Sequence, residues 1–250
     1  MKSLTKLRSI GLCALAFWGM MTSGLIAFLP QFLFGSNLLT TILMAGLYIF
    51  LYYLFAKWLS RRLGMNLIQF RMTLAKPSQF WIATAIFLPL TVLLVLYLLG
   101  GKVVLTDDVA TTIFMGAIAA PIVEEMCFRG IMMQLLEQAF SRKVAILGPS
   151  VFFGLVHLLN GAVSPLTALQ LLIAGTLVGS LFSLATLQTG SILSSILVHS
   201  LWNLFTSIFL FDNQSSLFGG EYGVDVSPIA SLAYLVVILL SMIAHRKKAS

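Results

Sequence analysis

Charge is scarce in this 250-residue chain, because only 9% of its residues are Asp, Glu, Lys or Arg while 59% are hydrophobic. A soluble globular chain carries about a quarter charged residues, so this composition excludes an ordinary soluble domain. The net charge of +7 comes without a basic cluster interleaved with polar aromatic residues, which argues against a nucleic-acid partner. Positive charge at the edges of apolar segments is instead typical of membrane topology.

Cysteine is almost absent as well. Cys13 and Cys127 lie in apolar segments and lack metal-type spacing, which argues against a structural disulfide. Cys127 follows Glu124 by three residues on roughly the same helix face, but a small buried hydrophobic residue is favoured over a ligand or nucleophile. The HExxH zinc signature, a Gly-rich phosphate loop and a GxSxG nucleophile elbow are also missing.

Long apolar stretches are abundant. Stretches of about 20 apolar residues cross a bilayer as helices, and the sequence has eight: 10–29, 38–56, 80–99, 108–130, 144–160, 166–187, 191–211 and 229–244. We therefore predict an all-α, polytopic membrane protein with a single domain over residues 1–250. The fourth span is expected to continue as an amphipathic extension to about residue 139. The first stretch resembles a signal peptide in its basic start, but its apolar length favours a retained span.

The basic residues predict the orientation of these spans. With a cytoplasmic N-terminus, thirteen of the 15 Lys and Arg residues are on the inner side, leaving Lys102 on an outer loop and Arg129 within a span. The outer loop 212–228 is then acidic, with Asp212, Glu221 and Asp225. This skew predicts eight spans with both termini in the cytoplasm. The inner residues are Lys2, Lys6, Arg8, Lys57, Arg61, Arg62, Arg71, Lys76, Arg142, Lys143, Arg246, Lys247 and Lys248.

Two further features concern packing and topology. Residues 57–79 mix basic and apolar residues irregularly. They either lie on anionic lipid at the cytoplasmic face or simply carry charges that set the topology. Gly175 and Gly179 form a GxxxG pattern in the sixth span, which lets another helix approach closely.

The strongly polar residues at membrane depth form one small set: Glu124, Glu125, Arg129, His157, His199 and Asn203. A charged side chain costs about 3 kcal/mol at the bilayer centre even on lenient scales, so such a set indicates a functional site. Glu125 and Arg129 have the i, i+4 spacing of an ion pair, which we expect to support the architecture. Glu124 points about 100° away from Glu125, while His199 and Asn203 share one helix face. The helical rise places Glu124 and His199 in the cytoplasmic half of the membrane and His157 higher.

These residue types suit peptide hydrolysis. Glu124 and His157 can orient and deprotonate a water, while His199 and Asn203 donate hydrogen bonds to the developing oxyanion. Alternatively, Glu124, His157 and His199 ligate a divalent metal such as zinc, which activates the same water.

Two rival functions come from other classes. One is a non-catalytic membrane scaffold or regulator that keeps these residues for stability. The other is a transporter or proton relay, since buried Glu and His also mark ion pathways. A transporter of this kind predicts broken helices in two related halves. Gly148-Pro149 breaks one helix, but no matching break is visible in another half.

Three motifs occur in order on separate predicted spans. They are Glu124-Glu125-Met-Cys-Phe-Arg129 (EExxxR), Phe153-Gly-Leu-Val-His157 (FxxxH) and His199-Ser-Leu-Trp-Asn203 (HxxxN). In these motifs the chain resembles the CAAX-protease and bacteriocin-processing (CPBP, Abi) family of intramembrane proteases, which includes the type II prenyl-protein endopeptidases. The resemblance covers a catalytic four-helix core at about residues 108–211. It implies water activation by Glu124 and His157, an oxyanion hole of His199 and Asn203, and a supporting role for Glu125, Arg129 and Phe153.

The resemblance also implies a cavity open to the cytoplasm and the lipid. The implied substrates are prenylated protein C-termini or, in bacteria, leader-bearing peptides such as bacteriocins. Because the compact chain shows no organelle address or appended domain, we expect a multi-pass protein of the bacterial cytoplasmic membrane that acts in peptide maturation or self-immunity. The expected partners are a membrane-associated peptide or protein substrate and the lipid bilayer. The first expectation for cofactors is that none is required, with a divalent metal as the alternative.

Overall fold

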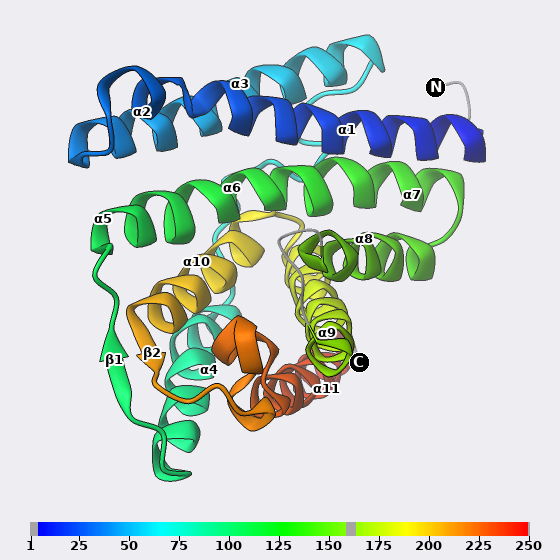
Figure 1. Cartoon of the computed structure of the whole chain (residues 1–250). Coiled ribbons are helices and arrows are strands. Elements are labelled where there is room, and N and C mark those ends of the chain that lie inside the picture. Colours follow the sequence, from blue (N-terminus) through cyan, green and yellow to red (C-terminus); the bar gives the residue numbers. More distant parts are fainter. Residues whose placement is uncertain (1–4, 159–163, 250) are drawn as a thin grey trace.

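A computed structural model describes residues 5–158 and 164–249 of the chain. Lys2, which contributes to the predicted orientation, and residues 159–160 of the predicted fifth span lie outside the described residues. The architecture is helical, as predicted (Figure 1). The α-helices are α1 (Lys6–Ala27), α2 (Leu29–Phe34), α3 (Leu38–Arg62), α4 (Gln79–Leu98), α5 (Val109–Thr111), α6 (Ala120–Glu125), α7 (Met133–Ala139), α8 (Arg142–His157), α9 (Pro165–Thr189), α10 (Leu193–Ile208) and α11 (Pro228–Ala249). The described helical elements also include two π-helical segments, η1 (Thr112–Ala119) and η2 (Met126–Met132), and two 3-10 segments, η4 (Ser216–Phe218) and η5 (Gly220–Val226).

Each predicted span coincides with a helix. Six helical stretches in the described chain are long and apolar enough to cross a membrane: Lys6–Phe34, Leu38–Arg62, Gln79–Leu98, Val109–Ala139, Pro165–Thr189 and Gly220–His245. The chain is therefore a multi-pass integral membrane protein. The predicted fifth and seventh spans correspond to α8 and α10, which have 16 residues each. That length gives about 24 Å of helix against a hydrocarbon core of about 30 Å, so eight complete spans with cytoplasmic termini stay a prediction.

The predicted fourth span, with its extension, is one 31-residue helical stretch, Val109–Ala139, made of α5, η1, α6, η2 and α7. In Figure 1 it crosses the molecule as the green rod beneath α1 and α3. The fully buried Ser9 of α1 donates its hydroxyl hydrogen bond to the Leu135 carbonyl of α7 at 2.8 Å. Because α1 packs on the helix that carries both glutamates, it is an integral part of the fold, which favours a retained first span.

The GxxxG prediction is confirmed by the close approach of α9 to α8. A Cβ atom on Gly175 would lie 2.6 Å from the Gly154 Cα, and one on Gly179 would lie 2.8 Å from the Ser150 Cα. Contacts this short with backbone atoms leave no room for a side chain. The small residues thus place α8, which ends at His157, directly against α9.

The segment between α3 and α4 packs against protein. Its Phe70 is completely buried, and its Arg71 has a left-handed backbone (φ 56°) and forms an ion pair with Glu137 of α7. The Arg71 carbonyl accepts a hydrogen bond from the Ile192 N–H at 2.9 Å, and the Thr73 carbonyl accepts one from the Ser191 hydroxyl at 2.7 Å. The segment therefore connects α7 with the start of α10, a packing role that neither interpretation of residues 57–79 included.

A short antiparallel sheet pairs the residues before α5 with those after α10, on the side of the protein that is predicted to be outer. Strands β1 (Val103–Leu105) and β2 (Phe209–Phe211) pair in the register Val103 with Phe211, Val104 with Leu210 and Leu105 with Phe209. Strand β2 follows α10 directly, so the predicted span 191–211 leaves the helical conformation after Ile208. Hydropathy does not reveal this change because the strand residues are as apolar as the helix before them.

Candidate active site

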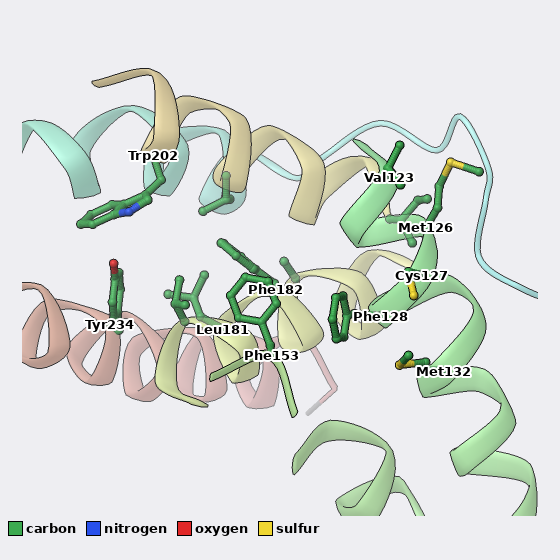
Figure 2. Close-up of a cluster of buried hydrophobic side chains, with 14 of the residues drawn as sticks. Val123, Met126, Cys127, Phe128, Met132, Phe153, Leu181, Phe182, Trp202 and Tyr234 are labelled. Carbon is green, nitrogen blue, oxygen red and sulfur yellow. The ribbon is translucent and has the colours of Figure 1, made fainter. Parts of the chain in front are cut away.

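A buried ion pair lies behind the site. Arg129 and Glu125 have no exposed surface, and the Arg129 Nη1 atom is 2.9 Å from the Glu125 Oε1 atom, which confirms the predicted i, i+4 pair. Arg129 Nη2 also donates to the Gly179 carbonyl of α9 at 3.1 Å. The rings of Phe128, Phe153 and Phe182 surround the guanidinium, with centroids 5.6, 5.0 and 5.1 Å from its central carbon. Figure 2 shows these three rings gathered between α9 and the long helix.

His199 is held on both sides by the two adjacent glutamates. Its Nδ1 atom lies 3.1 Å from Glu125 Oε1, the same oxygen that binds Arg129. Its Nε2 atom faces Glu124 Oε2 at 3.8 Å, and the Phe182 ring stacks on the imidazole at 4.6 Å. The two glutamates therefore play different parts: Glu125 anchors the far nitrogen, whereas Glu124, whose side chain is 23% exposed, reaches the nitrogen on the cavity side.

His157 is oriented by its own helix. Its Nδ1 atom is 2.7 Å from the Phe153 carbonyl, so Nδ1 carries the proton that is donated there and Nε2 is left as the basic nitrogen. The Phe153 ring packs on the imidazole at 4.6 Å. From the other side, the Tyr222 hydroxyl donates to the His157 carbonyl at 2.7 Å. These contacts fix both the ring and the main chain at the end of α8.

The helical hairpin of α7 and α8 brings Glu124 and His157 to the wall of one cavity. Glu124 lies sixteen residues before Phe140, and His157 lies sixteen residues after Ser141, the two residues of the turn. The two arms are therefore equal in number of residues, although Met126–Met132 of the first arm is π-helical. The depth of His157 in the membrane stays a prediction.

A proline explains how Asn203 is positioned. In η1 the Ala120 N–H bonds to the Met115 carbonyl, five residues back. In this register the next donor, for the Gly116 carbonyl, would be residue 121, but Pro121 has no N–H. The Asn203 Nδ2 atom donates to the Gly116 carbonyl at 2.9 Å instead. The π-helical register and Pro121 thus create the acceptor that holds this amide beside the site.

All four residues predicted to be catalytic line one cavity of about 170 Å³: Glu124, His157, His199 and Asn203. This volume is many times the roughly 15 Å³ that a single water requires. Phe153 lines the same cavity, whereas the Glu125–Arg129 pair lies behind the wall. Cys127 is a free, fully buried thiol in the core, as the hydrophobic interpretation predicted.

Asp225 is a cavity residue that sequence reasoning did not find. The acidic loop 212–228 was expected to be an outer loop, yet its η5 segment packs on α9 and contributes Tyr222, Asp225 and Val226 to the cavity wall. Asp225 Oδ1 accepts a hydrogen bond from the Trp202 indole at 2.7 Å. The cluster of Gly219, Gly220 and Gly223, all with positive φ, signals a tight turn in the sequence but gives no indication of where the turn packs.

The predicted metal ligands do not form a ready metal site in this arrangement. In the part of the chain that the structure describes, no three His, Cys, Asp or Glu side chains are grouped so that they could hold an ion. Both histidines engage Nδ1, His157 with its helix backbone and His199 with Glu125, which leaves their Nε2 atoms as the possible metal ligands. Metal dependence stays a prediction.

A comparison with family models identifies the core of the chain. Residues 106–205 match the family described as type II CAAX prenyl endopeptidase Rce1-like. The chain carries a domain of this family. The Rce1-like domain includes Glu124, Glu125, Arg129, Phe153, His157, His199 and Asn203, whereas Tyr222 and Asp225 lie beyond it. Comparisons with curated proteins and with solved structures found no significant match.

Proposed function

We propose that this protein is an intramembrane endopeptidase that cleaves a membrane-associated peptide or protein. The observation that carries the proposal is the convergence of four polar side chains on one cavity of an Rce1-like domain. Glu124 comes from the long helix, His157 from α8, and both His199 and Asn203 from α10. Burying these groups at membrane depth is costly, and hydrolysis is a use that explains their joint presence.

The proposed reaction starts with a water between Glu124 and His157. The Glu124 carboxylate takes a proton from this water while the His157 Nε2 atom accepts its other hydrogen as a hydrogen bond. The water oxygen then attacks the carbon of the scissile carbonyl, whose oxygen becomes an oxyanion. Glu124 passes its proton to the leaving nitrogen as the C–N bond breaks, which gives a new carboxylic acid and a new amine.

His199 and Asn203 are proposed to stabilise the oxyanion. Asn203 Nδ2 donates one hydrogen to Gly116 and has a second one to offer. Since the His199 Nδ1–H faces Glu125, donation to the oxyanion requires a second proton on Nε2. The resulting imidazolium would lie between the Glu125 and Glu124 carboxylates. Removal of one donor of this kind typically costs a factor of about 100 to 1,000 in kcat.

The family and the membrane setting support a proposed substrate class. The family name refers to CAAX prenyl endopeptidases, and the resemblance in the three motifs suggests leader-bearing peptides as the bacterial counterpart. We propose a bacterial cytoplasmic-membrane location and a role in peptide maturation or self-immunity, with the lipid bilayer as the second partner. A divalent metal such as zinc is the alternative way to activate the water, and the test below includes it.

The test is hydrolysis of a library of membrane peptides by purified wild-type protein and by Glu124→Gln, each with and without a chelator. We expect the Gln variant to be folded but inactive, because it loses the base and keeps the shape. Glu221→Gln, which changes an exposed glutamate outside the cavity, is the matched control and should keep full activity.

The outcomes separate three functions. Cleavage that is lost in Glu124→Gln but kept with chelator supports a metal-free glutamate protease. Cleavage that is lost both in Glu124→Gln and in the wild-type protein with chelator points to a metal-activated water. An active Glu124→Gln variant would contradict the assignment of the base. If a substrate found in cells stays uncut only when the whole protein is missing, and is still cut with Glu124→Gln, the protein is a scaffold.

A further inference from the structure

Asp225 gives the cavity a second carboxylate that the proposed hydrolysis does not use. It is exposed, although the Trp202 beside it is only 3% exposed. Its Oδ1 atom accepts the Trp202 indole hydrogen bond at 2.7 Å, and its backbone carbonyl accepts the Tyr234 hydroxyl at 3.3 Å. Figure 2 shows the Tyr234 hydroxyl pointing toward the Trp202 ring, and the two ring centroids are 5.0 Å apart. The carboxylate is therefore held in place on the cavity side of a buried aromatic pair.

The η5 segment that carries Asp225 is rigidly attached to the site. Tyr222, which is three residues before Asp225, donates its hydroxyl hydrogen bond to the His157 carbonyl. Gly219 has φ 95°, and a Cβ atom on it would lie 1.7 Å from the Gly223 carbonyl oxygen, so only glycine permits this turn. Hydrogen bonds to α8, α10 and α11 thus fix the position of Asp225 relative to His157.

Asp225 is the lining carboxylate that faces no cation of the proposed reaction. Glu124 faces His199, whose imidazolium the proposed oxyanion hole requires, at 3.8 Å, and none of the described lining residues is Lys or Arg. Arg129 lies behind the wall and is already paired with Glu125. A carboxylate has about four acceptor sites, and Asp225 uses one of them for Trp202. The neighbouring rings of Trp202, Tyr222 and Tyr234 offer π faces, which also attract cations.

We propose that Asp225 forms a specificity subsite for a cationic side chain, lysine or arginine, of the substrate near the cleaved bond. The inference rests on the proposed endopeptidase function. The ammonium or guanidinium group bonds to the free acceptor sites of Asp225 and packs on the aromatic rings, while the scissile carbonyl lies between Glu124 and Asn203. The same charge repels an acidic side chain at this position.

The test uses peptides that differ at one position only. The parent is a peptide cleaved by the wild-type protein, and its derivatives carry Lys, Gln or Glu at each position flanking the cut. We expect wild-type kcat/KM to be about tenfold higher for Lys than for Gln at one of these positions, mainly through KM, with Glu the poorest. Asp225→Asn keeps the acceptor for Trp202 and should abolish the Lys preference while the Gln peptide is cut within about threefold of wild type. Asp212→Asn, an exposed acid outside the cavity, should leave the preference intact.

A binding measurement makes the inference independent of hydrolysis. The probe is a fluorescein-labelled leucine–alanine membrane peptide with one central Lys or Gln, titrated into full-length Glu124→Gln protein in nanodiscs. The subsite is supported, even if no peptide is cut, when the Glu124→Gln protein binds the Lys peptide more tightly than the Gln peptide and the double variant Glu124→Gln, Asp225→Asn does not. Equal binding of both peptides, or an equal loss for both in the Asp225→Asn protein, overturns it. Hydrolysis that fails while this binding difference persists contradicts the proposed function alone.

Discussion

At the scale of single residues, Arg129 shows how a charge is kept inside a hydrocarbon environment. Its guanidinium binds a carboxylate at 2.9 Å and a backbone carbonyl at 3.1 Å, and three aromatic rings cover it. The carboxylate of Glu125 in turn binds His199. A buried pair contributes little net stability when intact, but breaking it leaves a buried charge without its partner.

Arg129→Ala should lower the free energy of unfolding by about 3–5 kcal/mol, because Glu125 stays buried without its counter-charge. Thermal unfolding of the purified protein in detergent measures the effect. Arg142→Ala, which removes an exposed arginine at the start of α8, is the control and should change stability by less than about 0.5 kcal/mol. Equal stabilities of the two variants would contradict the supporting role of the pair.

At this scale the sequence predicted four of the residues that line the cavity but missed Asp225. The spacing of Glu125 and Arg129 predicted their ion pair because both lie on one helix, where i, i+4 geometry is fixed. Asp225 escaped because its position depends on how a loop folds back, and loop composition does not determine packing partners. Charge counting placed all three acids of loop 212–228 on the outer side, and it carried no information about the hydrogen bond from Trp202.

At the scale of elements, the long helix carries π-helical segments on both sides of Glu124 and Glu125. Such segments are rare and often occur at functional sites, since they free or redirect backbone groups. Here η1 and Pro121 free the Gly116 carbonyl for Asn203. Pro121 is visible in the sequence, but the π register that makes it effective is a property of the packed helix.

Pro121→Ala supplies an N–H that competes with Asn203 for the Gly116 carbonyl. We expect kcat to fall by about tenfold or more through misplacement of the amide. Stability should be unchanged or higher, since a helix-interior proline costs about 3 kcal/mol. The measurements are peptide hydrolysis and thermal unfolding of the same preparation. Pro89→Ala in α4, which is not among the described cavity residues, should keep wild-type turnover. A Pro121→Ala enzyme of normal activity would show that the Gly116 contact is dispensable.

The α8–α9 contact gives a second prediction for an element. Gly175→Ala and Gly179→Ala each add a Cβ atom within 3 Å of α8 backbone atoms, so the helices must separate. We expect a loss of about 1–3 kcal/mol in unfolding free energy and weaker hydrolysis, because α8 carries His157. Gly46→Ala in α3, where nothing lies within 4 Å of the added atom, is the matched control. If Gly46→Ala destabilised the protein as much as Gly175→Ala and Gly179→Ala, the close approach of α8 and α9 would not be the cause of their instability.

The sequence predicted the elements well wherever apolar length decides the outcome. All eight predicted stretches coincide with helices, and the GxxxG pattern identified a face that packs closely. It did not predict that α8 and α10 have only 16 described residues each, or that Phe209–Phe211 forms a strand. Hydropathy records how apolar a stretch is but does not distinguish an apolar strand from the last turns of an apolar helix.

At the scale of the whole molecule, the distribution of basic residues predicts which face is cytoplasmic. The test uses single cysteines in a background in which Cys13 and Cys127 are replaced by alanine. Exposed Lys102→Cys should react with a membrane-impermeant thiol reagent added to intact cells, whereas exposed Lys76→Cys should react only after lysis. The reverse pattern would overturn the predicted orientation.

The equal arms of the α7–α8 hairpin also constrain how the length of the chain can change. An added residue between Glu124 and the turn would move that carboxylate about 1.5 Å along its helix and rotate it by about 100° relative to His157. An insertion in either arm alone therefore separates the pair, and only matched changes in both arms keep it together. By contrast, residues 213–215 lie between β2 and η4, and Gln214 and Ser215 are exposed, so length variation is expected to be tolerated there first.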